Sequence, residues 1–378
     1  MKVRANTPIR DRFVIIMAGG RGERFWPVSR ERNPKQLLNL LGKTSFLQQA
    51  VHRVTPLVPA ENILIITNAA QADAVSRQLP ELPKANIIAE PCGRDTCAAI
   101  TLGAALVGQR CTTAVMAVLP ADHVISEEKK FQQVLGDAFD LAARGQVMVT
   151  IGIKPTEPAT GYGYIKVGHP LPAPQGGKRW KTTFFKAEQF VEKPHHDKAV
   201  EYVNSGHYRW NAGMFIWSFV TVTQSLEMHQ PELAAVCQRW FKAAGDPRKL
   251  ASLLSRDYPG LKKISVDYAL MEKAQNVVVA NGDFAWDDVG AWPALTHHLK
   301  PDADGNCAVG EVLSVDGARN LVFDARTRNR TLTGIVGLRD AVIVFTDDAT
   351  LVTQRSQSQK VKELVRLLSV SRKYRALV

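Results

Sequence analysis

The chain has 378 residues, of which 45% are hydrophobic and 22% charged, and its formal net charge is +12. This length allows a large core and two domains, and the composition excludes a disordered or fibrous protein. No apolar run approaches the roughly 20 residues of a membrane span, and the basic residues are scattered rather than interleaved with aromatic ones, so we expect neither a membrane nor a nucleic-acid partner. A basic cleft for a small polyanion explains the charge more simply.

The N-terminus and the cysteines favour a cytoplasmic protein. A basic segment precedes the apolar run FVIIM (13–17), which is too short for the core of a signal peptide. The five cysteines are few and odd in number, which fits a reducing compartment without a disulfide framework. Cys92 and Cys97 lack a matching second pair, so a zinc site is not expected.

The first 150 residues alternate short apolar runs with helical stretches. Asp95 and Thr96 are candidate caps for the third of these helices. The alternation, with strands that are apolar almost throughout, predicts a Rossmann-like α/β fold with a mostly parallel sheet covered on both faces. The predicted strands are 13–17, 62–67, 86–90, 113–120 and 146–153, and the predicted helices lie near 45–54, 70–79, 95–109 and 128–144.

Later segments change in character. Between 150 and 300 the strand candidates GYGYIKVG, QFVEKP and WNAGMFIW alternate with a loop at 170–178 and with helices near 222–243 and 267–275. After about residue 300, short strands follow at close spacing, and the only helical stretch is KVKELVRLL near the end. We therefore predict a catalytic domain over 1–298 and a small β-rich, β-helix-like domain over 299–378 that ends in a helix.

Three polar motifs follow strands of the predicted sheet. AGGRGERFWPVSRERNPKQ (18–36) follows the first strand, EPCGRD begins at residue 90, and PADH begins at residue 120. Ligands of such sheets bind at the carboxyl ends of the strands, so we expect the three motifs to converge on one site.

The glycine-rich stretch fails the two common phosphate-binding patterns. It lacks the GK[ST] ending of a P-loop, and Phe25 stands where the third glycine of GxGxxG would be. This failure disfavours a dinucleotide-binding oxidoreductase. What remains is a turn at Gly19 and Gly20 that can bring main-chain N–H groups close to a phosphate, followed by Arg24 and Lys35.

Eight motifs in order carry a family resemblance. GGRGERFWPVSRERNPKQ resembles the signature of sugar-1-phosphate nucleotidylyltransferases, and its Phe-Trp-Pro form is typical of bacterial mannose-1-phosphate guanylyltransferases. The matches continue through EPCGRDTCAAI, LPADHVI, GYGYI, FVEKP, WNAGMF, SVDYALMEKA and WDDVGAW, and together they span residues 13–292. The β-rich tail is similar to the C-terminal region of that family. We expect the chain to lack the cupin-like isomerase domain of its bifunctional relatives.

The resemblance implies a reaction between two polyanions. An oxygen of mannose 1-phosphate attacks the α-phosphorus of GTP and expels pyrophosphate, so charge neutralisation and positioning dominate and no protein nucleophile is needed. Arg24 and Lys35 would stabilise the departing pyrophosphate, and both Lys35 and Asp122 are expected in loops outside the core. The resemblance assigns nucleotide binding to Ala18, Gly19, Gly20, Gly22, Glu90 and Asp122.

Glu90 is the candidate for base selection. A carboxylate there can accept hydrogen bonds from guanine N1–H and N2–H₂, whereas adenine offers no such donor pair and uracil offers a single imide N–H. Alternatively, Glu90 is a solvated acid at a strand end. Family members usually carry Asn where this chain has Asp95, which leaves the effect of Asp95 on base preference open.

Two acids are candidates for a magnesium site. Asp122 and Asp288 come from separate segments, and Mg²⁺ prefers few protein carboxylates together with phosphate oxygens and water. Asp287 is the alternative to Asp288, but the family pattern Trp-x-Asp-x-Gly favours Asp288. We expect His123 to be structural, because Mg²⁺ disfavours imidazole.

The resemblance places the sugar phosphate on a second group of residues. Lys193 resembles the lysine that holds the phosphate, and Glu192, Asn211 and Gly163 would complete the sugar pocket. Adjacent residues on a strand point to opposite faces, so Glu192 and Lys193 need a bend before Pro194 to act together. Trp26 is expected to pack under the glycine-rich loop rather than to stack on a base.

Two alternatives to the mannose enzyme stay open. The same chemistry on another hexose 1-phosphate, such as glucose 1-phosphate, fits the same residues, because Glu192 and Asn211 would contact hydroxyls of many sugars. A catalytically silent regulatory paralogue would have lost its phosphate-binding cations and metal acids, and these are retained here. The resemblance also suggests a homodimer formed through the β-rich tail.

Overall fold

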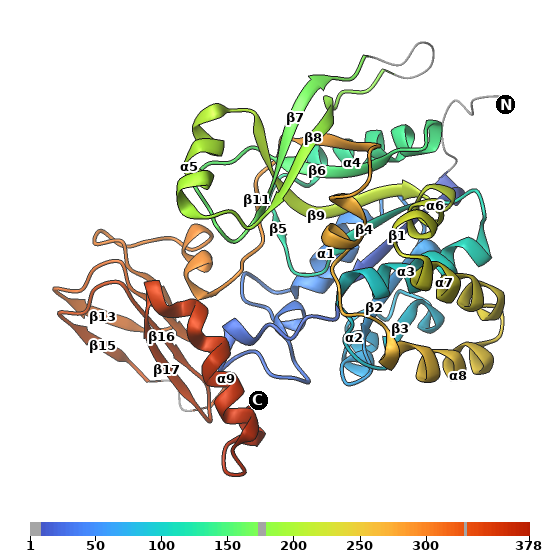
Figure 1. The fold of residues 1–378 in the computed structure, drawn as a ribbon. Helices are drawn as coiled ribbons and strands as arrows, with labels where there is room; N and C mark the ends of the chain where they lie inside the picture. Colours follow the sequence, from blue (N-terminus) through green and yellow to red (C-terminus); the bar gives the residue numbers. More distant parts are fainter. Residues whose placement is uncertain (1–8, 173–178, 329–330) are drawn as a thin grey trace.

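The computed structural model describes residues 9–172, 179–328 and 331–378. Most of the loop expected over 170–178 and most of the basic N-terminal segment lie outside the described residues. A large α/β part carries the N-terminal three quarters of the chain, and a smaller β-rich part with the red helix α9 (Val361–Val370) lies beside it (Figure 1).

A nine-stranded mixed sheet forms the centre of the α/β part. Its strand order is β3-β2-β1-β4-β9-β6-β10-β8-β7. The first four strands in this order are mutually parallel, whereas β9 lies antiparallel between β4 and β6. The strands are β1 (Arg12–Met17), β2 (Ile63–Asn68), β3 (Ile87–Glu90), β4 (Val115–Pro120), β6 (Met148–Ile153), β7 (Gly163–Pro170), β8 (Phe184–Glu192), β9 (Tyr208–Ser218) and β10 (Val277–Gly282).

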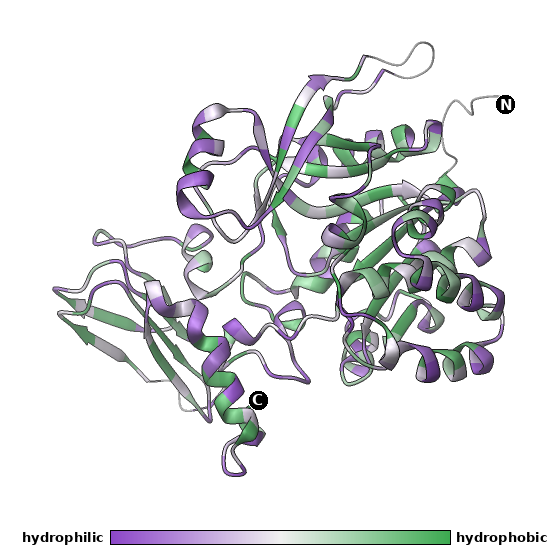
Figure 2. Cartoon of the chain, in the orientation of Figure 1, coloured by the Kyte–Doolittle hydropathy of each residue, from purple (hydrophilic) through white to green (hydrophobic). Residues whose placement is uncertain are grey.

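Alternating side chains of the strands build one core on each face of the sheet. In β1, Val14 and Ile16 face a core shared with α1, α2, α4 and α5, while Phe13 and Ile15 face a core shared with α3, α6, α7 and α8. Apolar strands therefore lie between amphipathic helices (Figure 2). The helices are α1 (Phe46–Val54), α2 (Ala72–Gln78), α3 (Asp95–Arg110), α4 (Glu128–Arg144), α5 (His196–Ser205), α6 (Phe219–His229), α7 (Pro231–Ala243) and α8 (Pro247–Asp257).

The four helices and five strands predicted in the first 150 residues are confirmed, with small shifts at their ends. The single helix expected near 222–243 is wrong, because it is two helices that meet at Gln230, before Pro231. Proline lacks an N–H and is tolerated in the first turn of a helix but not in its interior, so a new helix starts there. The helix expected near 267–275 is a short π-helical turn at Asp267–Met271.

The β-rich part is built from strands that alternate between two small sheets. β12, β14 and β16 are parallel in one sheet, β13 and β15 are parallel in the other, and β17 closes the first sheet antiparallel. This alternation is the coil of a β-helix and confirms the predicted fold class. The strands are β12 (Cys307–Val309), β13 (Val312–Val315), β14 (Leu321–Asp324), β15 (Thr333–Val336), β16 (Ala341–Phe345) and β17 (Thr350–Gln354).

The β-rich part packs directly against the glycine-rich stretch. Phe25 and Trp26 of that stretch share a buried cluster with Phe323 of β14 and with Val361 and Val365 of α9. Trp26 is 6% exposed, as expected for a residue that packs under the loop, and its indole N–H donates to the carbonyl of Leu377 at 2.7 Å. Within the described ranges, every helix falls short of the length and apolarity needed to cross a membrane.

Candidate active site

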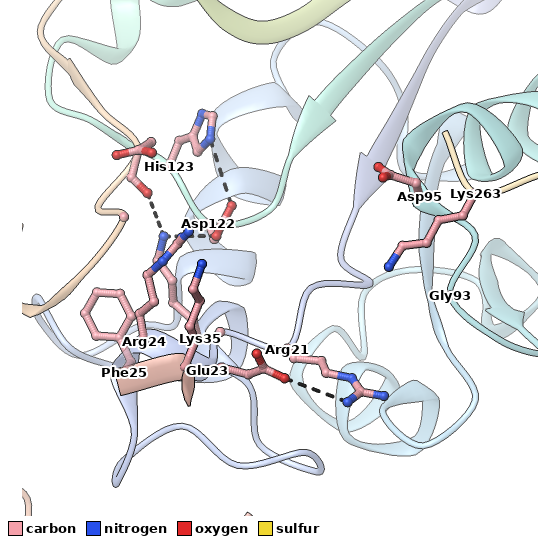
Figure 3. A pocket seen from close by; sticks show the side chains of 14 residues that line it. Arg21, Glu23, Arg24, Phe25, Lys35, Gly93, Asp95, Asp122, His123 and Lys263 are labelled. Atoms are coloured by element: carbon pink, nitrogen blue, oxygen red, sulfur yellow. Dashed lines mark hydrogen bonds and ion pairs between the residues drawn. The ribbon is translucent and has the colours of Figure 1, made fainter. Parts of the chain in front are cut away.

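The three polar motifs converge at the carboxyl ends of β1, β3 and β4, as the topology predicted. Two neighbouring cavities open there, of about 690 and about 330 Å³. They share the lining residues Gly93, Asp95 and Asp122. The larger cavity holds most of the charged side chains (Figure 3), whereas Gly19, Gly20 and Glu90 line the smaller one.

Gln36 holds the glycine-rich stretch in its fold. Its side-chain amide donates to the carbonyl of Ala18 at 2.7 Å and to that of Gly20 at 2.9 Å. Gln36 itself is 2% exposed. Because the buried Gln36 amide binds the carbonyls on either side of Gly19, the main chain of Gly19 and Gly20 is held in place at the cavity. Sequence reasoning gave Gln36 no role, although it ends the signature.

Gly22 permits a close approach that no other residue allows. Its φ is 61°, in the left-handed region, and a Cβ there would lie 2.5 Å from the Cβ of Lys35. The short helix η2 (Glu23–Phe25) begins directly after it and places Arg24 on the wall of the larger cavity. Arg24 is exposed, and no hydrogen bond or ion pair is recorded for it within the described ranges.

Lys35 is the most constrained cation of the site. It is 4% exposed, and its Nζ lies 2.9 Å from Asp122 Oδ2 and 2.6 Å from the carbonyl oxygen of Asp288 (Figure 3). The expectation that Lys35 lies outside the core is therefore wrong. Its ammonium lies 5.6 Å from the ring centroid of Phe25 and 5.4 Å from that of Phe46.

Asp122 and Asp288 line the same cavity, and Lys35 contacts the carboxylate of Asp122 and the main-chain carbonyl of Asp288. Burial opposes ionisation of Asp122, but Lys35 and His123 more than offset this effect, and the pKa of the carboxyl is held below its usual value. Asp288 Oδ1 accepts a hydrogen bond of 2.9 Å from the hydroxyl of Tyr162. His123 accepts one from the indole of Trp286 at 3.1 Å, which supports its structural role.

Asp287, the alternative metal ligand, is engaged elsewhere. Its carboxylate contacts the rings of His297 and His298 and accepts from the main-chain N–H of Val289. Burial would raise the pKa of Asp287, but these hydrogen bonds hold it at about 2. Since Asp287 does not line the cavity and Asp288 does, the geometry favours Asp288.

The donor set fits a hard divalent cation. The described residues contain no group of three or more His, Cys, Asp and Glu side chains close enough to hold a metal by themselves. Two carboxylates at one cavity suit an ion that takes its remaining ligands from phosphate oxygens and water. In this structure the ammonium of Lys35 pairs with the carboxylate of Asp122 and also donates to the main-chain carbonyl of Asp288.

Glu90 is buried and held by a residue far away in the chain. It is 6% exposed, and the hydroxyl of Tyr258 donates to its Oε1. Burial raises the pKa of Glu90 to about 7, and the hydrogen bond from Tyr258 lowers it in part. Its other oxygen faces Gly19, where a Cβ would lie 3.0 Å away. Glu90 is therefore not a solvated acid at a strand end.

Asp95 and Thr96 do not cap α3 as expected. Asp95 is the first helical residue, with a φ of 66°, and its Oδ1 accepts from the next main-chain N–H at 2.8 Å. Thr96 Oγ1 accepts from the main-chain N–H of Val266 at 2.9 Å. A left-handed position favours Asn and tolerates Asp, so conformation alone accounts for either residue there. Asp95 lines both cavities.

Gly163, Glu192, Lys193 and Asn211 lie together, as the resemblance implied. Lys193 has a φ of 49°, which is the bend that turns its side chain toward that of Glu192, with 2.9 Å between Nζ and Oε1. Gly163 pairs with Glu192 across β7 and β8, and a Cβ on it would lie 2.4 Å from Glu192 Oε2. The amide of Asn211 donates to Asp267 Oδ1 at 2.8 Å.

Tyr162 connects this group to the acids of the larger cavity. Its hydroxyl donates to Asp288, and its main-chain carbonyl accepts from the N–H of Lys193 at 3.3 Å. Its ring contacts Trp210 and Trp286 at 5.0 and 5.3 Å. Sequence reasoning did not single out Tyr162 or Asp267, although both lie inside quoted motifs. Tyr258 carried no signal at all.

The fold and the site are those of a nucleotidyltransferase: two adjoining cavities at the carboxyl edge of the sheet, one of them lined by cations and two acids, with a further polar group beside them. Comparison with protein families agrees. The nucleotidyl transferase model matches residues 13–304, and the MannoseP isomerase/GMP-like beta-helix domain matches residues 310–368.

Individual relatives indicate which kind of nucleotidyltransferase the chain resembles. The chain is 35% identical over 363 residues to mannose-1-phosphate guanylyltransferase 2 of Escherichia coli O157:H7, covering 95% of this chain and 74% of the relative. It is 38% identical to xanthan biosynthesis protein XanB of Xanthomonas campestris pv. campestris (strain B100), covering 93% and 72%. A crystal structure described as mannose-1-phosphate geranyltransferase from Thermus thermophilus superposes with a TM-score of 0.79 at 34% identity, covering 95% of this chain and 100% of that one.

The chain therefore belongs to the mannose-1-phosphate guanylyltransferase family of nucleotidyltransferases. Members of this family of enzymes generally use a divalent metal.

Proposed function

We propose that the protein transfers GMP from GTP to α-D-mannose 1-phosphate, giving GDP-mannose and pyrophosphate. A phosphate oxygen of the sugar attacks the α-phosphorus in line, and the bond from that phosphorus to the oxygen bridging to the β-phosphate breaks. The observation that carries the proposal is the position of Asp122, which lines both cavities and so lies between the pocket of Glu90 and the cluster of cations.

Glu90 reads the base in this proposal. A carboxylate has lone pairs for several donors, so Glu90 can keep the hydrogen bond from Tyr258 and still accept from guanine N1–H and N2–H₂. The glycines at 19 and 20 leave room for the nucleotide next to it. Adenine presents an acceptor where guanine presents N1–H, so with ATP the ionised carboxylate faces a lone pair instead of a donor.

The phosphates occupy the larger cavity. Gly22 and Arg24 line this cavity, and the main chain of Gly19 and Gly20 borders the adjoining one, where its N–H groups can meet the nucleotide. Lys35 stabilises the charge that develops on pyrophosphate as it leaves. To do so, its ammonium must turn from Asp122 toward the phosphates.

Asp122 and Asp288 would hold Mg²⁺, because carboxylate oxygens, phosphate oxygens and water are its preferred ligands. When bound, the ion supplies charge neutralisation between the two reacting phosphates. Tyr162 orients Asp288 through its hydrogen bond.

The sugar phosphate binds beside Tyr162. The exposed ammonium of Lys193 contacts the phosphate, and Glu192 and Asn211 contact sugar hydroxyls. Gly163 gives Glu192 the space it needs. Burial raises the pKa of Asp267 to about 6 and the nearby Glu192 adds to the rise, so Asp267 is a second acid beside this pocket.

A panel assay tests the proposal. Purified protein is incubated with each of four nucleoside triphosphates, Mg²⁺ and either mannose 1-phosphate or glucose 1-phosphate, and pyrophosphate release is followed. We expect release with GTP and mannose 1-phosphate, and loss of turnover in Asp122→Asn. Absence of release with this pair would overturn the proposal, and faster release with glucose 1-phosphate would establish the alternative hexose.

We also propose a cytoplasmic homodimer. The sheet of β13 and β15 exposes Leu313, Val315 and Val336 at 63%, 59% and 76%, an apolar surface that a second copy of the chain can cover. All five cysteines are free, which suits a reducing compartment. Light scattering of the wild type and of Val336→Asp tests the dimer: a monomer in both would refute it.

A further inference from the structure

One cation in the larger cavity comes from the C-terminal helix rather than from the catalytic motifs. Lys362, in the first turn of α9, lines the same cavity as Arg24, Lys35, Asp122 and Asp288. More than 300 residues separate it from the glycine-rich stretch. The family resemblance assigned no residue of the β-rich part to the site.

Packing fixes the start of α9 against the loop that bears Arg24. Val361 and Val365, one helical turn apart, are each 4% exposed and share a buried cluster with Phe25 and Trp26. Lys362 follows Val361, is exposed, and has no hydrogen bond or ion pair recorded within the ranges that the structure describes. Packing therefore fixes the main chain of Lys362 beside the cavity and leaves its side chain free to bind a ligand there.

The charge balance of the cavity calls for such a group. Lys35 is engaged by Asp122, and Arg21 lies 3.7 Å from Glu23. Of the lining cations, this leaves Arg24, Lys263 and Lys362 without a carboxylate partner in the described structure. A triphosphate carries more negative charge than Arg24 and Lys35 can offset together. Of the two further free cations, Lys362 belongs to the helix that packs against the loop bearing Arg24.

We propose that Lys362 binds the β- and γ-phosphates of GTP and stabilises the pyrophosphate as it leaves. The inference rests on the proposed function, since it assigns a ligand within that site. Lys362 transfers no proton: it offsets the charge that accumulates on pyrophosphate when the bond from the α-phosphorus breaks. The β-rich part thereby contributes directly to the nucleotide site.

The test compares Lys362→Ala with Lys360→Ala and Lys362→Arg. Lys360 is exposed and immediately precedes α9, but it does not line the cavity, so it is the matched control. In the forward reaction we expect kcat/KM for GTP to fall about tenfold in Lys362→Ala, to be unchanged in Lys360→Ala and to recover in Lys362→Arg.

The reverse reaction separates the leaving group from the rest of the nucleotide. We expect Lys362→Ala to raise the KM for pyrophosphate about tenfold and to leave the KM for GDP-mannose unchanged, because GDP-mannose lacks the departing phosphates. Equal KM values for pyrophosphate in Lys362→Ala and Lys360→Ala would overturn the inference. If the wild type fails to turn over, the proposed function fails first, so the two failures are distinct.

Discussion

The hydroxyl of Tyr258 donates a hydrogen bond to Glu90, a residue 168 positions earlier in the chain. Tyr258 is fully buried, and its ring stacks on Trp240 with a centroid distance of 5.6 Å. Burial raises the pKa of Glu90 to about 7, and the hydrogen bond opposes that rise. The charge of the proposed base-reading carboxylate thus depends on a tyrosine in the helical layer behind the sheet.

Tyr258→Phe should shift the pH dependence of GTP binding. Without the hydroxyl the pKa of Glu90 rises further, so a smaller fraction of Glu90 is ionised at neutral pH. Because the ionised form accepts from guanine, the KM for GTP should fall as the pH rises, with a midpoint near 7 in the wild type and a higher one in the variant.

Steady-state kinetics across the neutral pH range provide the measurement. Glu90→Gln is the control, because it cannot ionise there and its KM for GTP should not follow this titration. It should also lose part of the preference for GTP over ATP. An unchanged midpoint in Tyr258→Phe would show that the hydrogen bond from Tyr258 does not control the binding of GTP, and would contradict the prediction.

Lys35→Ala should lower kcat by about a hundredfold or more, since one charge-stabilising donor contributes about this much. It should also reduce stability, because Asp122 loses the counter-charge 2.9 Å away and remains partly buried. Magnesium ions should restore part of that stability by supplying positive charge between the two acids.

Thermal melts with and without Mg²⁺ test this second effect. The increase in Tm on adding Mg²⁺ should be larger in Lys35→Ala than in the wild type. Lys35→Ala combined with Asp122→Asn is the control, because it removes the unpaired charge and should respond least. An equal increase in Tm in all three proteins would contradict the idea that Mg²⁺ and the ammonium of Lys35 neutralise the same acids.

The sequence predicted the sheet edge and the convergence of the polar motifs on it, because both follow from local patterns. The apolar strands before residue 150 and the polar motifs after them place Glu90, Asp122 and Gly19 at one edge. The signature does not reveal that Lys35 is buried, since its exposure depends on Phe25, Phe46 and the packing of the β-rich part.

Sequence patterns could not predict site residues that lie far from the motifs in the chain. Tyr258 and Lys362 lie in segments without a chemical motif, and only tertiary packing brings them to the site. The position of the antiparallel strand β9 between β4 and β6 was not predicted either, because strand order is set by long-range packing and not by periodicity.

Gly163→Ala should impair sugar binding selectively. The added Cβ would lie 2.4 Å from Glu192 Oε2 and 3.5 Å from the Cβ of Asn211, so Glu192 must move. We expect the KM for mannose 1-phosphate to rise about tenfold or more, as for a lost polar contact, with the KM for GTP unchanged.

Gly161→Ala is the matched control for this change. Gly161 lies two residues earlier in the same motif, and a Cβ there would have no atom within 4 Å. Its kinetics should be those of the wild type. Equal kinetics for the two alanine variants would show that Glu192 does not need its present position.

Lys193→Ala should also raise the KM for mannose 1-phosphate, here by loss of the charge that meets the phosphate. Lys193 is 61% exposed, so the variant should melt at the same temperature as the wild type. Lys198 offers a close control, since it is also 61% exposed and also lies 2.9 Å from a glutamate, Glu201. The two lysines thus differ in location but not in exposure or in the length of their ion pair.

Initial rates at varied mannose 1-phosphate and saturating GTP distinguish them. We expect the KM to rise about tenfold in Lys193→Ala and to stay unchanged in Lys198→Ala, with kcat/KM for GTP changed in neither. A similar rise in both variants would point to the general positive charge of the surface. A rise in Lys193→Ala alone would place the sugar phosphate at the bend where β8 ends, next to Glu192 and the main chain of Tyr162.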